Sequence, residues 1–178
     1  VRALRRADAV IISRADQVTS QELEQLRTRL ASEVRPGVPI LAAAHRPIAW
    51  VDASGHRAAL DDPQLGPQGT VAAFCGIGNP DAFRCTLESL GRPPVAWRTF
   101  PDHHRFDRDD LESLAQWSRD AAAAAVVCTV KDLVKLETTR IGGRPLWALE
   151  IGLEFLDDPA PLLAALNDIA ARIGIALP

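Results

Sequence analysis

Short apolar runs alternate with amphipathic helical patterns along most of this chain. The apolar runs cover residues 9–12, 38–42, 70–75, 95–100, 123–128 and 145–151. Their nearly continuous apolar character is typical of strands that are buried on both faces. Parallel strands need a crossover connection, which is usually a helix. The alternation therefore predicts an α/β fold with three layers, αβα, in which helices cover both faces of an open, mostly parallel sheet.

Capping residues mark the expected helix starts. Thr19 and Glu22 have the spacing of a capping box, and Asn79 followed by Pro80 fits the first positions of a helix. Asp107 fits the N-cap of a further helix. The apolar positions that follow these caps, and those of a closing helix, have helical spacing. They are Leu23, Leu26 and Leu30; Phe83, Leu87 and Leu90; Leu111 and Leu114; and Leu162, Leu163, Leu166, Ile169 and Ile173.

A change of composition divides the chain. Residues 49–68 contain several prolines and glycines among scattered apolar residues, and we interpret them as a hairpin or linker. Residues 1–48 are then the end of a first lobe, built as strand, helix and strand, and residues 69–178 form a C-terminal α/β lobe. The sequence contains no methionine, so we expect the natural start to lie upstream.

Bulk composition excludes several classes of protein. The chain has 47% hydrophobic and 24% charged residues, which is ordinary globular composition. Its formal net charge of −3 provides no broad positive field, so we expect no nucleic-acid partner. No stretch approaches the ~20 apolar residues that span a bilayer. The three cysteines form no C-x-x-C pair, which favours a reducing, cytoplasmic setting over a zinc site or a catalytic thiol.

Polar clusters directly follow the predicted strands. They lie at residues 13–16, 45–46, 76–79, 102–104 and 129–132. In an open α/β sheet, ligands bind beyond the carboxyl ends of the strands. The recurrence of polar residues at this edge therefore predicts a functional site there.

Asp102, His103 and His104 form the cluster that is best suited to catalysis. A carboxylate beside two imidazoles suits proton transfer, orientation of a second acid, or metal ligation. A polar loop with an Asx turn is the alternative interpretation. Because adjacent side chains cannot easily point at one atom, we expect only one of the two histidines to be active.

The turn at Gly76, Gly78 and Asn79 is a weaker signal. It resembles half of a dinucleotide fingerprint but lacks the third glycine. Its glycines and the following helix N-terminus could bring N–H groups to a phosphate or a sugar oxygen. A tight strand-to-helix turn without a ligand explains the same residues.

Thr129, Lys131 and Asp132 place a hydroxyl, an ammonium and a carboxylate at another strand end. They could lie near a substrate phosphate, or the lysine and aspartate could simply pair with each other. The sequence contains no G-x-x-x-x-G-K-[ST] motif and no paired acids after a strand that could hold magnesium. This segment alone is therefore not expected to run a nucleotide-driven reaction, and we predict no metal ligands in it.

Four segments, by their residues, order and spacing, resemble the tetraacyldisaccharide 4′-kinase family, the lipid A 4′-kinases of Gram-negative bacteria. The resemblance covers nearly the whole chain. The segments are residues 7–16 (ADAVIISRAD), 74–83 (FCGIGNPDAF), 100–104 (FPDHH) and 127–136 (VCTVKDLVKL).

The resemblance implies a P-loop-kinase-like fold whose N-terminal part is missing here. It implies transfer of the γ-phosphate of ATP, with magnesium, to the 4′-hydroxyl of tetraacyldisaccharide 1-phosphate, the lipid A precursor. The family's phosphate loop, metal-binding acids and catalytic aspartate lie in the N-terminal half, so the isolated chain is expected to be inactive. The implied location is the cytoplasmic face of the bacterial inner membrane, with any anchor outside this chain.

The resemblance also assigns residues. The family's Asp-His pair maps onto Asp102 and His103, and its histidine supports the catalytic aspartate; His104 is the less constant position. Val130 departs from the family's common Thr-Glu-Lys-Asp pattern, which puts a role for that side chain in doubt. The other three positions of this pattern are intact: Thr129, Lys131 and Asp132.

Two alternatives remain at this point. A DHH-type metal-dependent phosphoesterase also uses an Asp-His-His run, but it needs carboxylate ligands upstream. The D-x-D of this chain, Asp107 and Asp109, lies downstream and is better explained as a helix cap. A non-catalytic, anion-binding α/β module would keep the sheet and the glycine turn without needing His103.

Overall fold

The computed structural model describes residues 3–62 and 66–175, which form two compact units. One unit comprises residues 1–46 and 152–178, and the other comprises residues 47–151. Two long strands, β2 (Ile40–Asp52) and β8 (Arg144–Phe155), contribute residues to both units. The organisation predicted from sequence, with boundaries at 48 and 68, stays a prediction.

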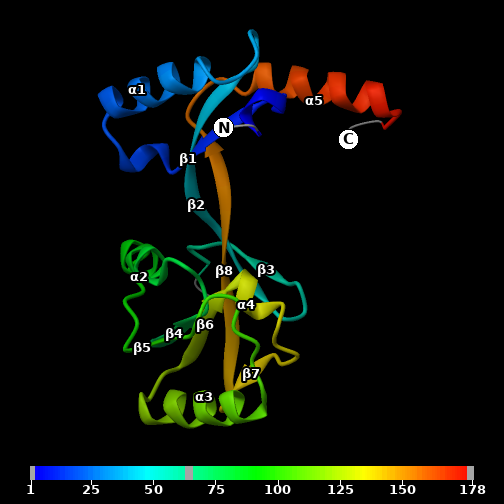
Figure 1. The fold of residues 1–178 in the computed structure, drawn as a ribbon. Coiled ribbons are helices and arrows are strands. Elements are labelled where there is room, and N and C mark those ends of the chain that lie inside the picture. Colours follow the sequence, from blue (N-terminus) through cyan, green and yellow to red (C-terminus); the bar gives the residue numbers. More distant parts are fainter. Residues whose placement is uncertain (1–2, 63–65, 176–178) are drawn as a thin grey trace. The chain divides into compact units, whose positions relative to one another are not determined.

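The unit of residues 47–151 contains a parallel sheet in the strand order β8, β6, β4, β5 (Figure 1). The central strand β4 (Val71–Cys75) pairs with β5 (Ala96–Thr99) and β6 (Ala125–Thr129), and β6 pairs in turn with β8. The mostly parallel α/β fold predicted from the alternation of strands and helices is confirmed.

Helices cover both faces of this sheet. Alternate β4 residues pack against Phe83 and Leu87 of α2 (Pro80–Ser89), while Phe74 faces Leu114 of α3 (Arg108–Asp120). All five β4 residues are buried, which explains their continuous apolar character. Burying one leucine or phenylalanine side chain contributes about 1.5–3 kcal/mol, so these contacts fix where the strand ends lie.

The predicted helix starts are confirmed. Thr19 and Glu22 form a capping box at α1 (Ser20–Ala31), and the Asn79 side chain accepts the Ala82 N–H at α2. Asp107 caps α3, with Asp110 completing a second capping box. These caps satisfy N–H groups that have no partner within the helix.

The strand predicted at 38–42 is longer than expected. β2 continues through His45 and Arg46 to Asp52 and then turns back, so that β3 (Arg57–Ala58) pairs antiparallel with Val51 and Trp50. The Trp50 indole is almost fully buried, which stabilises this extension. His45 and Arg46 therefore lie inside a strand, and the prediction that they follow a strand end is wrong.

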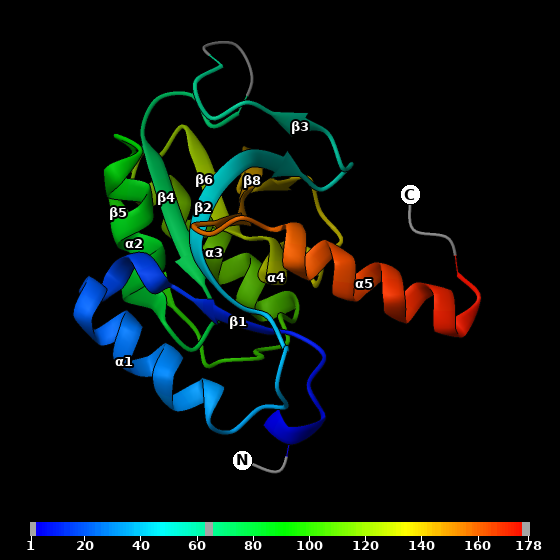
Figure 2. The ribbon, with the colours of Figure 1, turned by 90° about the horizontal axis from the view of Figure 1, so that it is seen from above.

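In the other unit, β1 (Val10–Ser13) pairs parallel with residues Ile40–Ala43 of β2. Helix α1 packs Leu23 and Leu30 onto this pair, and Figure 2 shows α1 running alongside β1. The Asp157 carboxylate accepts hydrogen bonds from the Ala42 N–H (2.6 Å) and the Arg27 guanidinium, and mainly the Ala42 bond lowers the pKa of Asp157.

The closing helix α5 (Ala160–Ile173) forms at the predicted place, but its apolar positions are only partly buried. Leu162 and Ala170 are buried, whereas Leu163, Leu166 and Ile173 are exposed.

Within residues 3–62 and 66–175, no helix is both long enough and apolar enough to traverse a bilayer. The remaining short elements are the 3-10 turns Leu4–Arg6 and Ala15–Gln17, α4 (Val130–Leu133) and β7 (Arg140–Ile141).

Candidate functional site

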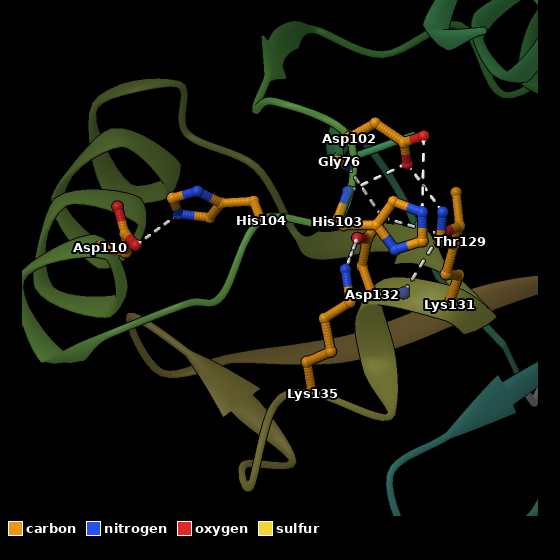
Figure 3. Close-up of polar contacts among 9 residues, drawn as sticks. All are labelled: Gly76, Asp102, His103, His104, Asp110, Thr129, Lys131, Asp132 and Lys135. Carbon is orange, nitrogen blue, oxygen red and sulfur yellow. Dashed lines mark hydrogen bonds and ion pairs between the residues drawn. The ribbon is translucent and has the colours of Figure 1, made fainter. Parts of the chain in front are cut away.

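Three strand exits meet in the unit of residues 47–151. The turn after β4, the loop after β5 and helix α4 after β6 are joined by hydrogen bonds and ion pairs (Figure 3). The predicted site residues at 76–79, 102–103 and 129–132 are therefore brought together at the carboxyl edge of the sheet. This convergence follows from the parallel strands, because their carboxyl ends point the same way.

Asp132 is the buried centre of this arrangement. Its side chain has no solvent exposure, and its Oδ2 accepts the Gly76 N–H (3.0 Å) and the Thr129 hydroxyl (2.7 Å). The Lys135 ammonium donates to Oδ1 at 3.2 Å. A buried carboxylate is tolerated only when it is paired and hydrogen-bonded, so Asp132 acts as a clamp between the β4 and β6 exits.

Gly76 and Gly78 differ in how closely they approach the neighbouring loop. A Cβ at position 76 would lie 3.1 Å from the Pro101 carbonyl oxygen and 3.2 Å from Asp132 Oδ1, and one at Gly78 would lie 3.5 Å from Asp102 Oδ2. A side chain at position 76 would therefore be tight against both neighbours, whereas one at position 78 would make an ordinary contact. The Gly76 N–H donates to Asp132, so it is not available to a phosphate in this structure, and the Asn79 side-chain oxygen accepts the Ala82 N–H of its own helix.

Asp102 and His103 form the exposed part of the site. His103 has a left-handed backbone conformation with φ of 62°, and its N–H donates to Asp102 Oδ1 at 3.0 Å. The Lys131 ammonium donates to the same carboxylate at 2.7 Å, and this bond is the main reason that the pKa of Asp102 is lowered. The His103 side chain is 79% exposed, and its Nε2 lies 3.8 Å from Asp102 Oδ2.

His104 has a different environment. Its ring stacks on Phe100 with 4.8 Å between ring centroids, and its Nε2 lies 2.7 Å from Asp110 Oδ2. Phe106 packs edge-on against the same imidazole. In Figure 3 the His104 side chain points toward α3, away from His103. His104 therefore anchors the loop to α3, and His103 is the histidine that a ligand can reach.

Sequence reasoning missed two residues of this network, Lys135 and Asp110. Lys135 follows Asp132 by three positions, a spacing at which helical side chains meet. Asp110 occupies the third helical position after its cap Asp107, the place of the acidic member of a capping box. Both signals were present in the sequence, but the partner histidine and the burial of Asp132 depend on the tertiary fold.

The thiols of the two buried cysteines are poorly suited to act as nucleophiles. Burial raises the pKa of the Cys75 thiol to about 12 and holds that of Cys128 well above its usual value. Cys85 is exposed on α2. A thiol acts as a nucleophile only as the thiolate, so the two buried cysteines serve as small core residues.

The clusters at 13–16 and 45–46 belong to the other unit. There Arg46 bridges Asp16 at 2.7 Å and Glu154 at 2.8 Å, so these charges hold β2 to the Ala15–Gln17 turn and to β8. Arg14 has a left-handed backbone with φ of 56°. These residues are not part of the site around Asp132.

Metal ligation does not fit the residues at hand. In the part of the chain that the structure describes, no three His, Cys, Asp or Glu side chains are arranged to hold a metal ion. The carboxylates of Asp102 and Asp132 are already paired with lysines. The residues at this site therefore offer no group of metal ligands for the DHH-type phosphoesterase interpretation.

Comparison with known proteins identifies a consistent set of relatives. The family model described as LpxK, tetraacyldisaccharide-1-P 4′-kinase, matches residues 1–171. A tetraacyldisaccharide 4′-kinase of Anaeromyxobacter sp. (strain Fw109-5) is 37% identical over 96% of this chain and 44% of its own length. That of Syntrophus aciditrophicus (strain SB) is 40% identical over 76% of this chain and 37% of its own length.

A solved structure supports the fold. The crystal structure of the "apo" form of LpxK from Aquifex aeolicus in complex with ATP has a TM-score of 0.55. The match covers 94% of this chain and 44% of that chain at 22% identity. The chain thus spans less than half the length of the relatives it matches.

Proposed function

The chain belongs to the tetraacyldisaccharide-1-P 4′-kinase family, and from this premise we propose that it is part of an ATP-dependent lipid kinase of lipid A biosynthesis. The proposed reaction transfers a phosphoryl group from ATP, with magnesium, to the 4′-hydroxyl of tetraacyldisaccharide 1-phosphate. The proposed setting is the cytoplasmic face of the bacterial inner membrane, where this lipid precursor would be reached at the membrane surface. The names of the relatives support this proposal.

The observation that carries the proposal is the exposed imidazole of His103 at the convergence of three strand exits. In phosphoryl transfer, catalysis rests mainly on positioning and charge stabilisation, and a base only orients and deprotonates the attacking hydroxyl. His103 would contact the carboxylate that serves as this base in the rest of the protein. Its loop is anchored through His104 and Asp102, which suits such a role because an imidazole on an unanchored loop would lose orientation.

ATP and magnesium would be held mainly outside this segment. Here the Gly76 N–H is used by Asp132, both acidic candidates are paired with lysines, and no phosphate-loop motif occurs. We therefore derive no catalytic step through a metal ion bound to these residues. The segment's proposed contribution is the histidine and the scaffold that orients it.

The test is replacement of His103 by alanine in the full-length kinase that carries this segment. We expect kcat to fall at least ~10-fold, because general acid–base groups contribute about 10²–10⁴ and a group that assists one contributes less. His56→Ala is the control, since His56 is an exposed histidine of the same unit whose ring contacts Trp147. Full activity of His103→Ala would favour a non-catalytic role for this segment.

A further inference from the structure

The Asp102 carboxylate lies between two cationic or potentially cationic groups. Lys131 Nζ is 2.7 Å from Oδ1, whereas His103 Nε2 is 3.8 Å from Oδ2. The first distance is a short charge-assisted hydrogen bond, and the second is too long for any hydrogen bond. The Oδ1 atom therefore binds Lys131 and the His103 N–H, whereas Oδ2 and the His103 ring lie at ion-pair distance without a hydrogen bond.

The neighbouring positions of Asp102 and His103 in the sequence favour an ion pair between their side chains. An aspartate directly before a histidine can capture the neighbouring imidazole in a local ion pair, and a captured ring cannot serve another carboxylate. We propose that Lys131 is a positioning residue that holds the Asp102 carboxylate away from the His103 imidazole and so keeps this imidazole free to contact a catalytic carboxylate. The inference rests on the proposed function, and it changes the role of Asp102 from a reacting group to an anchor of the loop.

The surroundings of His103 support this inference. The charged groups around it are Asp102 and Arg105 of its own loop and Lys131 of α4. Asp132 of α4 forms an ion pair with Lys135, which follows that helix, and His104 pairs with Asp110 of α3. Lys131 is thus the cation that is hydrogen-bonded to the Asp102 side chain, on Oδ1, and this bond is the main cause that lowers the pKa of that carboxyl.

A set of variants of the full-length kinase separates this role from general stability. In Lys131→Met the carboxylate loses its partner, and we expect kcat to fall roughly 10- to 100-fold with little change in KM, because small misplacements of an active group have effects of this size. Lys131→Arg keeps the cation and should restore most of the activity. Arg108→Gln, which removes one charge of an exposed ion pair on α3, should behave as the parent enzyme.

The decisive variant is the double substitution Lys131→Met with Asp102→Asn. Asparagine keeps an oxygen that can accept the His103 N–H but cannot attract the imidazole as an anion, so activity should recover by at least ~5-fold over Lys131→Met alone, as coupled neighbours allow. A double variant no better than Lys131→Met would overturn the inference, because the lysine would then act by another route.

Side-chain NMR of the same proteins, with aspartate and histidine labelled, tests the pairing without using activity. In Lys131→Met, the pKa of Asp102 should rise toward its ordinary value, and the His103 Nε2 resonance should show a new hydrogen bond to the carboxylate. Absence of both changes would refute the inference. Capture of His103 without any loss of kcat would leave the pairing in place and refute the proposed role of His103.

Discussion

At the scale of single residues, the backbone of His103 is the unusual feature of the site. A left-handed conformation costs a non-glycine residue roughly 1–2 kcal/mol, and such strain persists where the surroundings enforce it. The Asp102 hydrogen bond and the anchoring of His104 supply that enforcement. The sequence could identify Asp102 and His103 as candidates, but not this conformation or the Gly76–Asp132 contact, which joins residues 56 positions apart.

We predict that His103→Gly is more stable than His103→Ala by about 1 kcal/mol, because glycine adopts the positive φ without a Cβ clash while alanine keeps the strain. Chemical denaturation of the 178-residue chain measures this difference. Arg105 is the matched control, since it lies exposed in the same loop without a positive φ. At position 105, the glycine variant should be less stable than the alanine variant. If the glycine variant were also the less stable one at position 103, the strained conformation of His103 would be contradicted.

At the scale of elements, local signals were predictable and strand lengths were not. The caps of α1, α2 and α3 depend on residues within one turn, so the sequence contains all the information they need. β2 runs past Pro47 because Trp50 is buried against residues that follow much later, and β8 extends through exposed Ile151 and Leu153. Such extensions depend on a paired strand, which local patterns cannot reveal.

The start of α3 should show a pH-dependent stability. The bond to His104 is the main cause that lowers the pKa of Asp110, so the folded state favours the ionised carboxylate. The ionised Asp110 contributes its full share of stability above the pKa of about 4 that it has in the unfolded chain. This contribution is lost as the pH falls through the lower pKa of the folded state. Asp110→Asn should therefore lower the free energy of unfolding by about 1 kcal/mol at pH 7, and by progressively less as the pH falls below about 4.

Thermal or urea unfolding across this pH range measures the effect. Asp109→Asn is the control, because Asp109 is the exposed carboxylate beside it on the same turn, and its substitution should change stability little at any pH. A cost for Asp110→Asn that stayed constant down to pH 2 would show that packing, and not the charge, holds the loop to α3.

At the scale of the whole molecule, the site around Asp132 uses its lysines and one backbone N–H to bind its own carboxylates. Both lysines of the chain are engaged, Lys131 with Asp102 and Lys135 with Asp132. A nucleoside triphosphate needs backbone N–H groups and a free cation for its phosphates. In the turn after β4, the Gly76 N–H donates to Asp132 instead. The Gly76 N–H and the two lysines are thus used to hold the three strand exits together.

We accordingly predict that the 178-residue chain alone neither binds ATP tightly nor transfers phosphate. Isothermal calorimetry with ATP and magnesium should show no micromolar binding, while the full-length kinase that carries this segment serves as the positive control. Circular dichroism of the same sample establishes that the chain is folded during the titration. Micromolar binding of ATP by the chain would contradict the prediction.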